Sequence, residues 1–227
     1  MKLTKNISAI AIIVLGVINF GYSQGATSID VATEKLRMSA DASKPIDAQG
    51  SPYVDDNFLP VKVKGFDNQI FTGRFNAYNG EMEVNLGTKI IALDKSSDYE
   101  VIFTQTNKIY RTFSYQTEKG VSKNGFLAVV DESEDFAILK QEVVKYFERI
   151  EPLSSYQQPK PAKFKRENDF YYLKKGNKIT FLPTKKKTLL KAYPKQAKAI
   201  KAFIKENKLS TTKEEDLVKI AKHISTL

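Results

Sequence analysis

The feature that most constrains the fold is a change of hydrophobic period near Pro183. From Ser51 to Phe181, short runs of β-branched and aromatic residues alternate with turn residues, which is the pattern of antiparallel strands. After Pro183 the apolar residues recur every three or four positions, which is the period of amphipathic helices. We therefore expect an α+β fold in which an antiparallel β-rich meander or small barrel is followed by two to three C-terminal α-helices.

The candidate strands are residues 59–66, 70–78, 81–86, 89–93, 99–104, 109–115, 126–130, 136–147, 170–173 and 178–181. Between the second and third runs, Asn79-Gly80 predicts a hairpin with a type I′ turn, because both residues tolerate a positive φ. The aromatic stripes that contain Phe103 and Tyr115 are interpreted as core rather than as a binding surface, since such stripes usually pack against another sheet face.

Three segments fit the helical part. Residues 185–192 can form a short helix, and Pro194 suits the first turn of a second helix. In the last helix, Thr212 followed three residues later by Glu215 predicts a capping box. With short connections between them, these helices are expected to pack on the β part.

The first residues have the three parts of an export signal. Lys2 and Lys5 precede an apolar run, and small residues at 21 and 23 mark a cut near Ser23/Gln24. A membrane anchor is the alternative, but a spanning helix needs about 20 apolar residues and this run is shorter. The chain has no cysteine, so we expect neither disulfides nor a bacterial lipid anchor. We also expect no transmembrane span after cleavage of the signal. The expected location is the periplasm or the exterior.

We divide the chain into four parts. Residues 1–23 are the signal peptide, 24–50 a flexible leader, 51–182 the antiparallel β domain, and 183–227 a basic helical C-terminal subdomain packed on the β part. Charge separates them further. Residues 24–157 carry 15 basic and 20 acidic side chains, a net charge of −5, whereas 158–227 carry 19 and 6, a net charge of +13.

Lysines concentrate in the first part of the helical subdomain and form the candidate contact site for anionic surfaces. They are Lys185, Lys186, Lys187, Lys195, Lys198, Lys201, Lys205 and Lys208. Lysine clusters attract anions over about one Debye length, and lysine favours diffuse attraction over bidentate phosphate recognition. The expected partners are anionic envelope lipids or glycans, or an envelope protein. The alternative is a solvated helix face with no partner.

An acidic pair in the β part is the candidate for an alternative site. Glu81 and Glu83 lie two residues apart on one expected strand, so both project from the same face. Two such carboxylates suit acid and base roles or a cation, which would make the protein a hydrolase or lyase of an envelope polymer. A row of water-facing side chains is the other interpretation.

Other chemistry has little support in the residues. The single histidine, His223, lies in the last expected helix, and no nucleophile elbow, phosphate-binding loop or dinucleotide fingerprint is present. The sequence therefore predicts no catalytic residue, no cofactor and no metal site. The basic region lacks a nucleic-acid-binding motif, so no specific nucleic acid is expected. The absence of tryptophan weakens, without excluding, the case for a carbohydrate-stacking module.

Several segments between Gly50 and Ile224 carry a resemblance to a known family. They are Gly50-Ser51-Pro52-Tyr53 with Phe58, the run Arg74-Phe75-Asn76-x-Tyr78-Asn79-x-Glu81-x-Glu83, the strand end at Tyr146, residues 160–164, Tyr171-Tyr172, and residues 205–209 and 214–217. In these the chain is similar to a family of uncharacterised exported proteins of Bacteroidetes. The resemblance implies a Gram-negative envelope home and the order of strands before helices. It carries no activity.

These observations favour a non-enzymatic, exported soluble protein, associated with the envelope, that binds or supports anionic material through its basic helical end. The alternatives are the carboxylate-based hydrolase or lyase and an assembly role in which a sheet edge or the helices dock on a partner. The oligomeric state does not follow from the sequence.

Overall fold

The structure is a computed structural model that describes residue 36 and residues 40–66, 69–134, 136–152 and 158–227. The expected signal peptide lies outside the described residues, and so does the first part of the expected leader.

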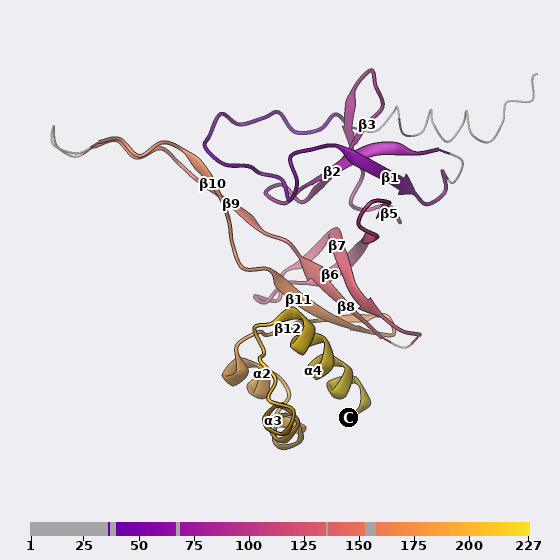
Figure 1. The fold of residues 1–227 in the computed structure, drawn as a ribbon, viewed down its shortest axis with the longest axis vertical. Coiled ribbons are helices and arrows are strands. Elements are labelled where there is room, and N and C mark those ends of the chain that lie inside the picture. Colours follow the sequence, from indigo (N-terminus) through magenta and orange to yellow (C-terminus); the bar gives the residue numbers. More distant parts are fainter. Residues whose placement is uncertain (1–35, 37–39, 67–68, 135, 153–157) are drawn as a thin grey trace, which may run out of the picture.

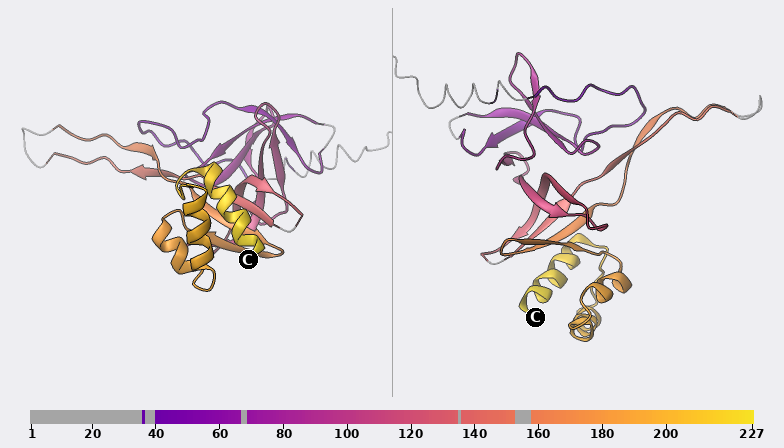
Figure 2. Two further views of the ribbon diagram at one scale, coloured as in Figure 1. Left: turned by 60° about the horizontal axis from the view of Figure 1, so that its bottom comes forward. Right: turned by 180° about the vertical axis from the view of Figure 1, so that it is seen from behind.

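In the described residues, ten strands form one antiparallel sheet and two more form a separate ribbon (Figure 1). The strands of the sheet are β1 (Leu59–Val63), β2 (Phe71–Asn76), β3 (Glu81–Asn85), β4 (Ile90–Ala92), β5 (Glu100–Phe103), β6 (Lys108–Gln116), β7 (Ser122–Glu132), β8 (Phe136–Gln141), β11 (Phe170–Lys175) and β12 (Lys178–Leu182). Their order across the sheet is β12-β11-β8-β7-β6-β5-β1-β2-β3-β4. The ribbon pairs β9 (Val144–Phe147) with β10 (Lys163–Arg166) and projects from the body as an arm (Figures 1 and 2).

Three helices of the described residues follow the sheet: α2 (Lys186–Ala192), α3 (Ala197–Glu206) and α4 (Glu214–Thr226). They gather on one side of the sheet, below it in Figures 1 and 2. The expected α+β fold, with an antiparallel sheet before C-terminal helices, is therefore confirmed. Within the part of the chain that the structure describes, no helix has both the length and the apolar composition to cross a membrane.

The capping box predicted for the last helix is wrong. The residue that caps α4 is Lys213, and it makes no side-chain cap hydrogen bond. The carboxylate of Asp216 instead accepts a hydrogen bond of 2.9 Å from the backbone N–H of Ser210. The acidic first turn of α4 still complements the positive end of the helix dipole.

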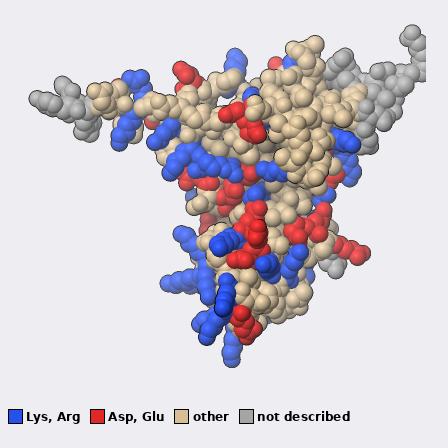
Figure 3. Space-filling model, in the orientation of Figure 1, with Lys and Arg blue, Asp and Glu red and all other residues tan. Residues whose placement is uncertain are grey.

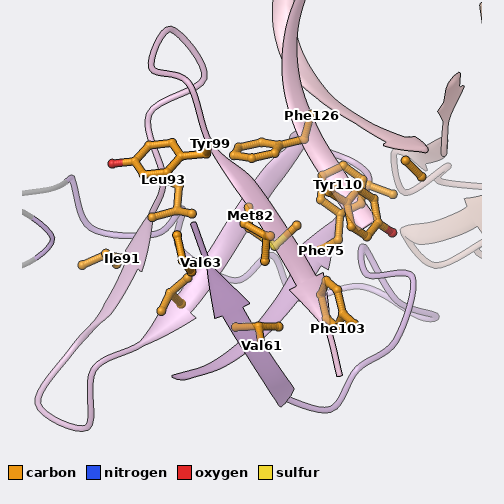
Figure 4. Close-up of a cluster of buried hydrophobic side chains, with 14 of the residues drawn as sticks. Val61, Val63, Phe75, Met82, Ile91, Leu93, Tyr99, Phe103, Tyr110 and Phe126 are labelled. Carbon is orange, nitrogen blue, oxygen red and sulfur yellow. The ribbon is translucent and has the colours of Figure 1, made fainter. Parts of the chain in front are cut away.

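The N-terminal half of the sheet curls around one apolar cluster (Figure 4). Val61 and Met82 are fully buried in it, and the ring of Tyr110 lies 4.7 Å from that of Phe75 and 5.6 Å from that of Phe103, measured between centroids. Alternation along each strand directs these side chains to the same face. The interpretation of the Phe103 stripe as core is confirmed.

The other half of the sheet, from β6 to β12, is apolar on both faces. On one face Ile138 and Leu173 pack with Leu189, Ile200 and other residues of the three helices. Leu139 is the neighbour of Ile138 on β8 and Tyr172 is the neighbour of Leu173 on β11, so both point to the opposite face, where they pack with Tyr115. Curvature brings Cα atoms of β12 within 8 Å of β6, although these two strands are not hydrogen-bonded neighbours.

The hairpin between β2 and β3 forms where Asn79-Gly80 predicts it, but its turn differs. Asn76 pairs with Glu81, so the connection has four residues rather than two. Gly80 has φ +66°, whereas Asn79 is not among the residues with positive φ. The prediction of a type I′ turn is therefore wrong. A four-residue loop needs one left-handed residue at its end, and glycine supplies it.

The single long strand expected at 136–147 is also wrong. β8 ends at Gln141, and the chain leaves the sheet through Glu142 and Val143 before it starts β9 in the arm. β10, which pairs with β9 along its whole length, is a strand that the residue pattern did not predict.

Residues 40–50, the end of the expected leader, lie against the body. Two backbone hydrogen bonds flank Ile91 of β4: the N–H of Ala42 donates to the carbonyl of Ile90, and the carbonyl of Ala40 accepts from the N–H of Ala92. Gln49 forms a parallel bridge with Lys163 of the arm. The contacts of Ala40 and Ala42 cover the outer edge of β4, which would otherwise present free backbone groups.

Two strand glycines allow a stability test of this packing. A Cβ at Gly73 would lie 3.0 Å from the backbone oxygen of Glu83 and 3.1 Å from the buried side chain of Val61, so we expect Gly73→Ala to lower the free energy of unfolding by about 1–3 kcal/mol. A Cβ at Gly125 would meet only Tyr115, at 3.6 Å, and Gly125→Ala should leave stability unchanged or raise it slightly. Urea unfolding of both variants measures the difference. Equal stability of the two would contradict the packing described for β2.

Candidate functional site

The eight lysines predicted as a contact site lie on and just around α2 and α3, and every one of them is exposed. We call this set the lysine face. Figure 3 shows Lys and Arg side chains gathered over these two helices. Leu189, Ile200 and Ile204 bury the opposite side of the helices against the sheet, which directs the lysines outward. The structure therefore brings these lysines together on the outer side of one helix pair.

The charges of the lysine face are not neutralised by the protein. None of its lysines is in an ion pair with a described residue, whereas Lys140 and Lys222 elsewhere pair with Glu214 and Asp131. In residues 184–209 the sole acidic residue is Glu206, and arginine is absent. The positive potential of this surface is therefore available to an external anion.

The acidic pair on β3 has partners within the protein. Glu83 is buried, with 1% of its side chain exposed, and accepts a hydrogen bond of 2.8 Å from Nε of Arg74. Glu81 projects from the same face and accepts hydrogen bonds from the backbone N–H and the hydroxyl of Ser43. Neither carboxylate lines any of the pockets described below.

Arg74, one of the residues that carry the family resemblance, is the centre of a cluster that the sequence did not predict. Its guanidinium carbon lies 3.6 Å from the ring centroid of Tyr53 and 4.3 Å from that of Phe58. Burial, followed by the charge of Glu83, raises the pKa of Tyr53. Asn76 donates to Glu83 as well, at 3.3 Å. These contacts fix the segment that contains Tyr53 and Phe58 on β2 and β3, a structural role that needs no ligand.

A second buried carboxylate, absent from the sequence predictions, stands where the arm leaves the sheet. Glu142 has 5% of its side chain exposed and pairs with Nζ of Lys108 at 2.7 Å and with Arg166 at 3.3 Å. The hydroxyl of Tyr110 also donates to it. Arg166 in turn pairs with Asp169 at 2.8 Å. This junction cluster joins β6, the end of β8, β10 and the start of β11.

Burial and charge within the junction cluster shift the pKa values of Glu142, Tyr110 and Asp169. Burial opposes ionisation of Glu142, but Lys108, the Tyr110 hydroxyl and Arg166 together hold its pKa below the ordinary value of 4.5. Burial, and then the charge and hydrogen bond of Glu142, raises the pKa of Tyr110 far above its ordinary range. Asp169 behaves in the opposite way to Glu142, because burial raises its pKa above the ordinary value of 3.8. The two ion pairs therefore favour a charged Glu142 in the folded protein.

Three pockets share lining residues, and Asp169 of the junction cluster lines one of them. One of about 480 Å³ lies at the base of the arm, and one of about 780 Å³ lies between β12 and the end of the β6–β7 hairpin. A third, of about 270 Å³, connects them, since Glu118 lines all three. Phe170 and Phe181 each line two of them. We call the second and third pockets together the aromatic groove.

The residue pattern did not predict this groove. Tyr115 lies in the core, as the sequence predicts, with 6% of it exposed, and Phe181 lies on an expected strand for which the sequence predicts no further role. The signal available was the run of rings at Phe170, Tyr171 and Tyr172, but the approach of β12 to β6 follows from curvature that one sequence does not specify.

The remaining polar groups do not assemble a metal or nucleophile site in the described residues. No group of three or more histidine, aspartate or glutamate side chains there is arranged to hold a metal ion. His223 stacks on Phe203 with ring centroids 4.1 Å apart, which gives it a packing role.

Comparison with known proteins gives no relative: no family model, curated protein or solved structure matches this chain. The resemblance to exported Bacteroidetes proteins stays a prediction, and the function is argued from the chain's own residues.

The junction cluster predicts a specific pH dependence. Because folding lowers the pKa of Glu142, its contribution to stability is complete above about pH 5 and is lost as the pH falls through the folded-state pKa. We expect Glu142→Gln to lower the free energy of unfolding by roughly 3 kcal/mol at neutral pH, and by less in acid, since it leaves Lys108 without an ion-pair partner among the described residues and Arg166 with Asp169 alone.

Asp169→Asn is the matched control. The raised pKa of Asp169 makes its contribution fall as the pH rises, so the difference between this variant and the natural chain should change with pH in the opposite direction. Chemical denaturation between about pH 3 and pH 7 measures both. Parallel pH profiles for the two variants would contradict the assignment.

Proposed function

We propose that this chain is an exported, non-enzymatic protein that docks through its lysine face on the anionic head groups of an envelope membrane. The observation that carries the proposal is the set of eight exposed lysines on the outer side of α2 and α3, none of which forms an ion pair with a residue that the structure describes. A protein surface with this charge, in a segment whose sole acidic residue is Glu206, gains most from an external anionic plane.

The composition of the face favours a lipid surface over a single bound anion. Lysine ammonium groups are point charges on flexible stems, and the segment has no arginine to grip one phosphate with two hydrogen bonds. Except for Lys185, the lysines lie outside the three connected pockets, so they do not converge on one ligand. Many separated charges contact many head groups, each contributing about 1 kcal/mol near the surface.

Export supplies the setting for this role. The export signal expected at residues 1–23 would put the chain outside the cytoplasm. Retention at the membrane then depends on the lysine face. The buried, paired Glu83 offers no support for the alternative of a carboxylate-based hydrolase or lyase.

A vesicle-binding experiment tests the proposal. The natural chain should sediment with vesicles of phosphatidylglycerol and phosphatidylcholine at low salt and be released as salt approaches about 0.5 M. Changing Lys195, Lys198, Lys201 and Lys205 to Gln should weaken binding by about two to three orders of magnitude, the equivalent of about 1 kcal/mol per lysine.

The control removes the same charge elsewhere. Changing Lys62, Lys64, Lys160 and Lys163 to Gln lowers the net charge equally, but these exposed lysines lie on β1, its following loop and the arm. This variant should keep most of the binding. Equal losses in both variants, or binding to a soluble anionic polysaccharide but not to vesicles, would contradict a lipid-docking face.

A further inference from the structure

The aromatic groove lies on the side of the sheet opposite the helices and is independent of the lysine face. Its larger part is formed by the end of β6, the β6–β7 turn and β12. The volume of about 780 Å³ falls within the range of about 300–1,000 Å³ that small-ligand sites occupy. The groove is therefore large enough to hold a ligand.

Aromatic rings form a continuous row along it. Ring centroids are separated by 4.9 Å between Tyr115 and Tyr172, 5.9 Å between Tyr172 and Phe181, and 6.0 Å between Phe181 and Phe170. Tyr172 is buried, whereas Phe181 is half-buried and Phe170 is 37% exposed. The negative face of an exposed ring contacts groups that carry small positive charge, such as the C–H groups of a pyranose.

Free amides stand on opposite walls of the larger part. Gln116 ends β6 and Asn177 lies in the β11–β12 turn, and both are exposed. The side-chain amide of neither makes a hydrogen bond to another described residue. By contrast, Ser114 already donates to Asn124 at 2.6 Å. An amide offers two donors and an acceptor, which matches a sugar hydroxyl that both donates and accepts.

The charges of the groove do not select an ion. Lys119, Lys123 and Lys178 line it together with Glu118, so both signs are present among a majority of uncharged lining residues. An inserted peptide strand does not fit either. Neighbouring strands are about 4.8 Å apart, so a strand between β12 and β6 would need them about 9.6 Å apart, and their Cα atoms approach within 8 Å.

From these observations we infer that the aromatic groove binds a neutral oligosaccharide, with sugar faces on Phe181 and Phe170 and sugar hydroxyls on Gln116 and Asn177. This inference adds a ligand site to the proposed membrane-docking role and does not depend on it.

Isothermal titration and NMR chemical-shift mapping with cellohexaose, chitohexaose and maltohexaose test it. We expect at least one hexaose to bind with a dissociation constant of about 1 mM or lower, with shifts centred on the groove and affinity unchanged by salt. Gln116→Ala and Asn177→Ala, both at exposed positions, should each weaken binding by about fivefold. Phe181→Leu, which keeps apolar bulk but removes the ring, should weaken it by about tenfold.

The variant that lacks Lys195, Lys198, Lys201 and Lys205 is the control and should bind the hexaose normally. Thermal unfolding of each groove variant verifies that it is folded. The inference is overturned if none of the three hexaoses binds at about 5 mM, if binding disappears with added salt, or if folded Gln116→Ala and Asn177→Ala variants bind like the natural chain.

Discussion

Two-sided burial of β8, β11 and β12 is the constraint on which the architecture depends. Each of these strands carries apolar residues at successive positions, so both of its faces must be covered. The helices cover one face through Ile200, Ile204 and Leu217. The other face is covered by the curvature of the sheet itself, which brings β12 towards β6. The lysine face follows from the helices that cover one face of these strands, and the aromatic groove follows from the curvature that covers the other.

The junction cluster lies where the arm leaves the sheet and stabilises that departure. Where a chain leaves a sheet, its backbone groups lose their hydrogen bonds to the neighbouring strand and need other partners. Here the backbone N–H of Val143 donates to the carboxylate of Asp169 at 3.3 Å, and its carbonyl accepts from the backbone N–H of Glu167 at 3.0 Å. Glu142 sits beside it with Lys108 and Arg166 on either side. The position of the arm thus depends on this charge pairing together with the burial of Val144 and Phe164 in the main apolar cluster.

The sequence was a good guide wherever a local period decided the structure. The alternation that buries Val101 and Phe103, and the helical spacing that buries Ile200 and Ile204, are properties of short segments. Prediction failed where partners distant in the chain decided it. Glu142 fits the polar position of an alternating strand, and nothing near it in sequence announces Lys108 or Arg166. Likewise the lysine face followed from composition and helical period, but Gln116 and Asn177 became neighbours across a groove through sheet curvature alone.

The placement of the two surfaces has a mechanical consequence. Between the lysine face and the aromatic groove lie the helices and a single layer of strands. If both proposed surfaces bind, a partner on one side leaves the other side open, and the protein would be bivalent without a flexible linker. Rigid bivalency of this type would hold two different materials at a fixed separation, and each engagement would raise the effective concentration for the other. The wall formed by β8, β11 and β12 would then serve as a spacer between a charged bilayer and a neutral polymer.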